Sequence, residues 1–285
     1  MKKYRPISRI LKGKPTLEGA GVRLNRVFGY YEVPLLDPFL LLDDFHSDNP
    51  DEYVKGFPWH PHRGIETMTY MFQGSIRHED SIGNKGVIHS GDAQWMTAGS
   101  GIIHSEMPDQ DRGLLWGLQL WVNLPAGLKM SEPRYRDISS GSVPIVESGG
   151  VAVRIIAGDY EGTRGPAQDI AADPHYLDIT IGEGKTFEVE QQRSRKVFAY
   201  VIEGTASFGQ DGHSIGPGTL ALFSEGDAVQ ISAGNTAARL ILVSGNPIGE
   251  PVAWQGPIVM NTEQELAIAF DEYYNGTFLK HKRGK

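Results

Sequence analysis

A weak internal repeat constrains the fold of this 285-residue chain more than any other feature. Residues 69–75 (TYMFQGS) resemble residues 199–205 (AYVIEGT), and the two glycines of these segments, Gly74 and Gly204, lie 130 residues apart. Each segment is followed by a second turn, at Gly91 in the first copy and at Gly218 in the second. Repeated β modules of this kind indicate a duplicated barrel.

The rest of the chain supports an all-β fold. Its 35 glycines and 17 prolines separate short runs rich in β-branched and aromatic residues, among them 151–156, 176–181 and 238–243. Residues 262–274 are the exception, because Thr262 and Glu265 match a capping box that precedes an apolar stripe. We therefore predict two antiparallel barrels and a short C-terminal helix.

Composition narrows the classes of function. The formal net charge of −8 argues against direct nucleic-acid binding, which depends on phosphate neutralisation by Lys and Arg. The chain has no cysteine, so disulfides and thiolate metal ligands are excluded. No apolar signal segment or membrane-spanning run is visible in the sequence. We expect a cytoplasmic protein with no membrane partner.

Four side chains form the strongest chemical signal. His60 and His62 are spaced i, i+2, and so are His104 and Glu106. Alternate side chains of a strand leave the same face, so two facing strands would direct three imidazoles and one carboxylate at one point. Such a nitrogen and oxygen donor set suits a transition metal. Pro61 has no N–H, which predicts an edge strand or a strand end here.

The second half of the repeat does not carry this donor set. The positions 130 residues after His60 and His62 hold Glu190 and Gln192. The positions about 127 residues after His104 and Glu106 hold Ile231 and Ala233. Prolines and glycines punctuate residues 125–144, and we divide the chain into an N-terminal barrel with the metal site, 1–130, and a C-terminal barrel with the helix, 131–285. The metal is expected in the first barrel only.

The donor set does not determine the identity of the metal. Three histidines and one glutamate fill four of six octahedral positions, which suits Fe(II), whereas Mn, Co, Ni, Cu and Zn are also compatible. Zinc held by four protein ligands would be a closed structural site. Glu66 is a further candidate ligand if the strand of His62 continues, but it could equally pair with Arg63 or Arg77; we assign it to a supporting role outside the ligand set.

At these residues the chain resembles the pirins, a family of the cupin superfamily. The segments that carry the resemblance are FPWHPHRGIET (57–67), HED (78–80), GDAQWMTAGSGIIHSEMP (91–108), LQLWVNLP (118–125) and GPIVMNT (256–262). The resemblance implies a bicupin, in which two antiparallel, jelly-roll-like cupin barrels pack face to face and the N-terminal barrel holds one metal. The family's ligands carry over to His60, His62, His104 and Glu106.

The resemblance also implies an activity. Several pirins are similar to quercetin 2,3-dioxygenases, which open the central ring of a flavonol with O2 and release carbon monoxide. By that analogy the flavonol's 3-hydroxyl and 4-carbonyl would bind the metal, and Glu106 would act as the catalytic base. The flat substrate would lie in an apolar slot, whose candidate lining residues are Phe57, Trp59, Trp95, Met96 and Gln119. For each of these residues, plain core packing is an equal alternative.

Two other functions stay open from the sequence. Some pirins are regulators that bind a transcription factor or a metabolic enzyme, with the redox state of the metal as the switch. A protein partner would then replace the flavonol and O2 as the physiological ligand. Alternatively, the metal stabilises a scaffold without turnover.

Overall fold

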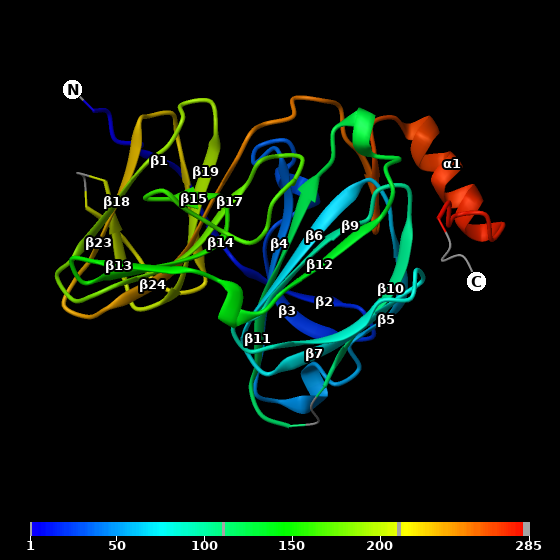
Figure 1. The fold of residues 1–285 in the computed structure, drawn as a ribbon, viewed down its shortest axis with the longest axis horizontal. Helices are drawn as coiled ribbons and strands as arrows, with labels where there is room; N and C mark the ends of the chain where they lie inside the picture. The colour runs from blue at the N-terminus through cyan, green and yellow to red at the C-terminus, as the bar shows by residue number, and fades with distance from the viewer. Residues whose placement is uncertain (1, 110–111, 210–211, 282–285) are drawn as a thin grey trace. The chain divides into compact units, whose positions relative to one another are not determined.

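The structure is a computed structural model that describes residues 2–109, 112–209 and 212–281. The chain divides into two compact units. The first barrel consists of Lys14–Ser140 together with the chain from Ile248, and the second barrel consists of the chain up to Gly13 together with Gly141–Pro247. Both are built almost entirely of antiparallel strands, which confirms the predicted all-β architecture (Figure 1).

The first barrel has two main sheets. The larger has seven strands in the order β12 (Arg134–Ile138), β9 (Ala93–Thr97), β6 (Ile65–Gln73), β11 (Leu115–Asn123), β4 (Phe39–Ser47), β3 (Val22–Phe28) and β2 (Lys14–Glu18). The smaller has four strands in the order β5 (Phe57–His62), β10 (Ile102–Pro108), β7 (Ser75–Asp80) and β8 (Lys85–His89). A two-stranded sheet is formed by β25 (Ala253–Gln255) and β26 (Ile258–Met260). Short 3-10 turns lie at Tyr30–Glu32, Pro50–Glu52, Ala126–Leu128 and Ser140–Ser142.

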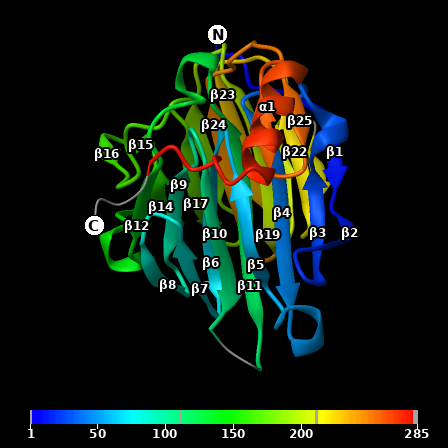
Figure 2. The same cartoon turned by 90° about the vertical axis from the view of Figure 1, so that its right-hand side faces the viewer.

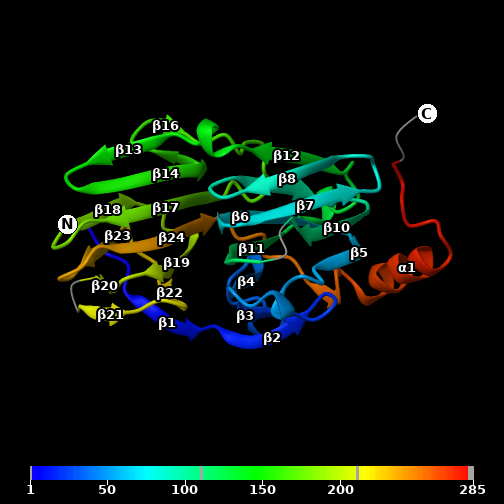
Figure 3. The same ribbon diagram turned by 90° about the horizontal axis from the view of Figure 1, so that it is seen from below.

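The second barrel repeats this plan (Figure 3). Its seven-stranded sheet has the order β1 (Ile7–Lys12), β22 (Thr219–Phe223), β19 (Lys196–Glu203), β24 (Ala238–Gly245), β17 (His175–Ile181), β14 (Val151–Ala157) and β13 (Ile145–Ser148). Its four-stranded sheet has the order β18 (Thr186–Glu190), β23 (Ala228–Ala233), β20 (Ala206–Phe208) and β21 (His213–Ile215). A small ribbon joins β15 (Asp159–Tyr160) to β16 (Thr163–Arg164).

The strand orders of the two barrels correspond position by position. Strands β9, β6, β11, β4 and β3 of the first barrel match β22, β19, β24, β17 and β14 of the second. The segments whose similarity revealed the repeat lie in the matching strands β6 and β19 and in the turns that follow them. The weak sequence repeat is therefore a repeat of topology.

The termini depart from a linear division of the chain at residue 130. Strand β1, at the N-terminus, pairs with β22 and so belongs to the second barrel. The C-terminal segment, which the sequence grouped with the second half, belongs to the first barrel. Helix α1 (Glu263–Tyr274) lies beside β25 (Figure 2). Its buried Leu266 and Ala269 pack with residues of β25 and β26.

The helix itself follows the sequence prediction. Thr262 caps its N-terminus by accepting a hydrogen bond from the backbone N–H of Glu265, whose side chain bonds back to the backbone of Thr262. In the described parts of the chain, no helix has both the length and the apolar character that a membrane crossing requires.

Candidate metal centre

Two neighbouring strands of the smaller sheet carry the predicted donors. Strand β5 pairs antiparallel with β10, so that His60 lies opposite His104 and His62 lies opposite Ile102. Strand β5 is an edge strand, as the missing N–H of Pro61 predicted. The strand ends at His62 and the chain turns at Gly64, whose φ of 76° belongs to the left-handed region; a Cβ there would lie 1.9 Å from the carbonyl oxygen of Val259. Only glycine fits this turn.

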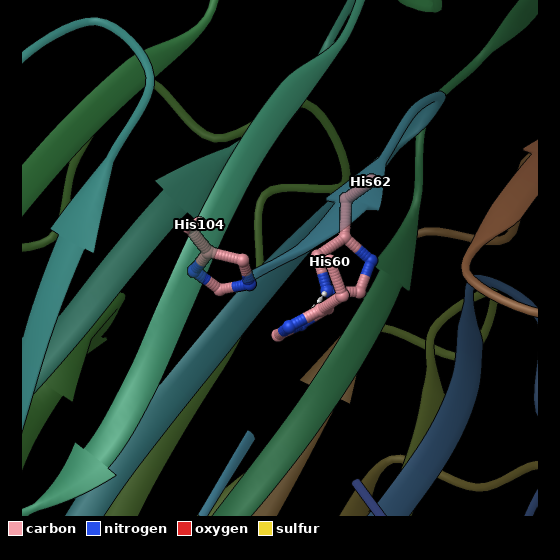
Figure 4. A group of neighbouring side chains, drawn as sticks. All are labelled: His60, His62 and His104. Carbon is pink, nitrogen blue, oxygen red and sulfur yellow. Dashed lines mark hydrogen bonds between the residues drawn. The ribbon is translucent and has the colours of Figure 1, made fainter. Parts of the chain in front are cut away.

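The three imidazoles converge between these strands (Figure 4). Each of His60, His62 and His104 offers a ring nitrogen, and these nitrogens lie within 4.8 Å of one another. The Nδ1 of His60 lies 2.8 Å from the carbonyl oxygen of Pro58, and the Nδ1 of His62 lies 3.2 Å from that of Pro257. Because a carbonyl only accepts, both Nδ1 atoms carry the proton, and in the neutral rings both Nε2 atoms carry lone pairs.

This arrangement fits a cation. The Nε2 atoms of His60 and His62 lie 3.1 Å apart, so with both Nδ1 atoms protonated this contact requires either a proton or a metal ion between the two nitrogens. Both ring nitrogens of His104 are buried, and neither has a hydrogen-bond partner among the described residues. Burial lowers the pKa of His62 and that of His104 well below the usual range, so both rings are neutral at neutral pH. Imidazole nitrogens with available lone pairs are suitable ligands for a borderline transition metal.

The fourth predicted ligand, Glu106, lies apart from this group of nitrogens. Among the described residues, the donor atoms within 4.8 Å of one another come from the three histidines, without Glu106. The buried Glu106 carboxylate instead accepts hydrogen bonds from Gln119 Nε2, at 3.0 and 3.2 Å, and from Thr69 Oγ1, at 3.3 Å. The indole N–H of Trp121 donates to Gln119 Oε1 at 3.0 Å, which fixes the orientation of the amide.

Glu66 is not placed to bind a metal at this site. Thr69, on the same strand, contacts Glu106 in the barrel interior. Since neighbouring side chains of a strand alternate between its faces, Glu66 belongs to the opposite face of β6. There it accepts a hydrogen bond from Thr97 Oγ1 at 2.7 Å, and burial raises the pKa of its carboxyl. The turn at Gly64 separates its strand from that of His62, which breaks the alternation assumed from the sequence.

A cleft of about 820 Å³ opens beside the histidines. Three of the five predicted slot residues, Phe57, Trp59 and Gln119, line it together with His60 and His62. The other two predicted residues, Trp95 and Met96, are buried and do not belong to its lining. Met96 is part of an apolar core cluster of the first barrel.

Several residues that line the cleft were not predicted from the sequence. Trp121 stacks edge-on against His62 at 5.0 Å between ring centroids, and Trp254 lies 5.9 Å from Trp121. Tyr30 closes another part of the wall against Trp254. The i, i+2 spacing of Gln119 and Trp121 was a usable signal, because both project from one face of β11. Tyr30 and Trp254 come from distant segments, and no local pattern marks them.

The C-terminal segment supports the ligand strand through Arg63. This arginine is buried, donating from Nε to Ser100 O at 2.7 Å and from Nη2 to Phe278 O at 2.8 Å. Its Nη1 pairs with Glu272 of α1 at 2.8 Å, and its guanidinium lies 4.2 Å from the ring centroid of Phe278. Because Arg63 directly follows His62, these contacts hold the metal-site strand against the helix and tail.

The second barrel has an apolar interior at the corresponding strands. Phe187 of β18 and Val229 and Ile231 of β23 belong to one continuous core cluster, and Val189 packs against it. Glu190, which the sequence offset equated with His60, has a side chain that is 79% exposed. Within the described residues, the one group of donors suited to a metal is that of the first barrel.

Comparison with known proteins agrees with this architecture. Residues 21–122 match the family model of pirin, and residues 176–279 match that of the pirin C-terminal cupin domain. A pirin-like protein of Caulobacter vibrioides is 47% identical over 96% of this chain and 99% of its own length. Pirin-1 of Arabidopsis thaliana is 43% identical over 90% of this chain and 89% of its own.

A solved structure shows the same likeness. The crystal structure of quercetin 2,3-dioxygenase from Acinetobacter baumannii superimposes with a TM-score of 0.89 at 30% identity, covering 96% of this chain and 98% of that one. The fold is thus that of a bicupin, with a histidine cluster in one of its two cupin barrels. The chain belongs to the pirin family.

Proposed function

We propose that this protein is a metal-dependent dioxygenase that opens the ring of a flavonol such as quercetin with O2. The observation that carries the proposal is the convergence of three imidazoles beside a large aromatic cleft. A structural metal would have no need of such a cleft, whereas a flat aromatic ligand fits walls made of Trp59, Trp121 and Trp254. The name of the Acinetobacter baumannii neighbour supports the same activity.

The metal would be held by His60, His62 and His104, with Glu106 as the fourth ligand. Fe(II) is our first choice, since nitrogen and oxygen donors with open positions suit it. When bound, a metal of this kind acidifies a chelating hydroxyl and brings the substrate and O2 together. The carbonyl oxygens of Pro58 and Pro257 fix the tautomers of His60 and His62, which keeps their Nε2 lone pairs available.

Glu106 is our candidate for the catalytic base. Its carboxylate is held by Gln119, which lines the cleft, whereas Glu106 lines a small adjoining cavity of about 20 Å³. A carboxylate has about four acceptor sites, so Glu106 can bind the metal or receive a proton from the substrate's 3-hydroxyl while it still accepts from Gln119. Gln119 therefore orients the carboxylate of Glu106.

The test combines metal analysis with turnover. Purified protein should contain about one transition-metal ion per chain, and the Fe(II)-loaded form should consume O2 and release carbon monoxide with quercetin. Glu106→Gln should retain the three histidines and the metal but lose most of its turnover, by the roughly 100-fold or more that a general base contributes. Metal-loaded protein that leaves quercetin unchanged under O2 would refute the dioxygenase proposal.

A further inference from the structure

A row of polar side chains crosses the aromatic cleft away from the histidines. Gln119 on β11 lies opposite Asp43 on β4, and Asp43 lies opposite Arg26 on β3. All three residues line the cleft, and these strands are neighbours in the sheet. With about 4.8 Å between neighbouring strands, the row extends about 10 Å from Gln119 to Arg26. This span is comparable to the length of a three-ring flavonoid.

The far end of the row is a charged cluster. Arg26 holds Asp43 through two parallel hydrogen bonds, from Nε at 2.9 Å and from Nη2 at 2.8 Å. Its Nη1 lies 2.9 Å from Oε1 of Glu18, a residue that also lines the cleft. These three contacts use three of the five N–H groups of the guanidinium, which leaves two for a ligand. The Arg26 side chain is 29% exposed and that of Glu18 is 39% exposed, so both are accessible.

The charges of this cluster select a class of ligand. Two carboxylates and one guanidinium give a net charge of −1, which disfavours an anionic group. A hydroxyl suits the cluster better, because it donates to a carboxylate and accepts from an arginine N–H. Two adjacent hydroxyls on one ring satisfy both partners at once. The remaining wall, with Tyr30, Phe57 and Trp254, suits the flat face of the same ring.

We propose that Glu18, Arg26 and Asp43 form a recognition subsite for a ring with two adjacent hydroxyls, on an aromatic ligand whose other end lies at the histidines. The proposal rests on the proposed function, since it assumes that a flavonol-like molecule occupies the cleft. It makes this cluster the specificity determinant that distinguishes catechol-bearing flavonols from those with an unsubstituted pendant ring.

The experiment compares two flavonols on the zinc-loaded full-length chain, so that binding is measured without turnover. Quercetin carries the two adjacent hydroxyls, and galangin has none on the same ring. Fluorescence titration should give a dissociation constant about tenfold lower for quercetin, the ratio expected from one good charge-assisted contact pair. The double variant R26Q/D43N, which replaces the ion pair with two amides, should reduce this preference to about twofold or less by weakening quercetin binding more than galangin binding.

Two further variants keep the test decisive. Arg26→Lys retains the charge but loses the two parallel hydrogen bonds, and it should lose part of the preference even if the double variant does not fold. Arg23→Gln is the matched control on the same strand, because Arg23 pairs with Glu52 and does not line the cleft. It should bind both flavonols as the unmodified protein does.

The outcomes separate this inference from the dioxygenase proposal. Two results overturn the subsite: equal binding of quercetin and galangin by the unmodified protein, or an undiminished preference for quercetin in both Arg26 variants. Either result does so whether or not the iron-loaded protein turns quercetin over. A quercetin preference that is lost in the Arg26 variants supports the subsite even if turnover is absent. Binding of neither flavonol overturns the subsite as well.

Discussion

Replacing Arg63 with methionine should weaken both the fold and the metal site. Arg63 is buried and makes three charge-assisted contacts with the loop at Ser100, with α1 and with the tail at Phe278. It follows His62 in the chain, and its carbonyl oxygen accepts from the N–H of Val259 at 3.0 Å. Arg63→Met keeps most of the side-chain volume but removes all of the donors.

The magnitude follows from these contacts. Removing one partner of a buried ion pair typically destabilises a protein by about 3–5 kcal/mol. The lower end applies, because the Glu272 side chain is 24% exposed and retains Lys280 as a partner at 2.7 Å. Two backbone carbonyls also lose their donor. We expect the free energy of unfolding to fall by about 3 kcal/mol and metal affinity to fall about tenfold, as for loss of groups that orient metal ligands.

Two assays measure these effects separately. Urea unfolding of the metal-free protein, followed by circular dichroism, reports stability, and competition with a chromogenic chelator reports metal affinity. Glu272→Gln is the control, since its amide oxygen can still accept from Arg63 and the carbonyl contacts of Arg63 remain; it should cost less than Arg63→Met, about 1.5 kcal/mol, with little change in metal affinity. A loss below about 1 kcal/mol in Arg63→Met would contradict the energetic argument. A full loss of stability with unchanged metal affinity would show that Arg63 does not support His62.

Three other changes test the interior of the first barrel. His104→Leu should abolish metal binding. It should also raise the unfolding free energy of the metal-free protein by about 1–3 kcal/mol in urea titrations, because it removes two buried nitrogens that have no hydrogen-bond partner among the described residues. A metal-free variant less stable than the unmodified protein would refute this. Gln119→Leu should lower turnover of quercetin, because the Glu106 carboxylate loses the donor that orients it, while metal content, measured by mass spectrometry, stays near one per chain. The pKa of Lys129 is lowered by burial to about 8, so its protonation penalises the folded state below that pH. The unfolding free energy should therefore rise by up to about 3 kcal/mol between pH 8 and pH 10.5, a rise that is absent in Lys129→Met.

The sequence predicted the parts of the site that depend on strand alternation. The i, i+2 spacing of His60 and His62 predicted that both rings leave one face of a strand, because that constraint is local. The strand of His104 was expected to face this strand, but it is its hydrogen-bonded neighbour in the same sheet. The repeat of residues 69–75 at 199–205 likewise predicted a duplicated topology, since matching strands need matching turns. The capping box at Thr262 predicted where α1 begins.

A constant sequence offset did not assign equivalent positions in the two barrels correctly. The offset of 130 equated His60 with Glu190, but the inward positions of β18 are those of Phe187 and Val189. The pairing of β5 with β10 has a register shift between His104 and Glu106, whereas β18 pairs with β23 without one. A difference of one residue exchanges the two faces of a strand, so a constant offset cannot assign faces across a bulge.

Long-range contributions to the site have no local signal. The carbonyl of Pro257 that fixes His62, and the ring of Trp254 in the cleft, come from a C-terminal segment that the sequence grouped with the other barrel. Gly64 was visible as a glycine in the sequence, but its need to approach Val259 follows only from the packing of that segment. The same segment positions Arg63, whose partners lie far along the chain.

The two barrels of one chain allow a comparison of how the metal site affects the stability of a barrel. In the second barrel, Val153, Leu177, Ala199 and their neighbours form one continuous apolar core. The interior of the first barrel has separate apolar clusters around Leu41 and around Phe45, and it also buries His104 and other polar groups. Each buried polar group without a partner costs about 1–3 kcal/mol.

An interior of this kind is unfavourable for the empty barrel and favourable once a cation engages the imidazoles. Because binding of a ligand to the folded state stabilises it by mass action, a metal at 100 times its dissociation constant adds about 2.7 kcal/mol. Chelation should therefore lower the unfolding temperature of the intact protein, whereas His104→Leu should be insensitive to the chelator. If the chelator destabilised both proteins equally, its effect would arise outside the histidine cluster, and the assignment of the first-barrel interior to metal binding would fail.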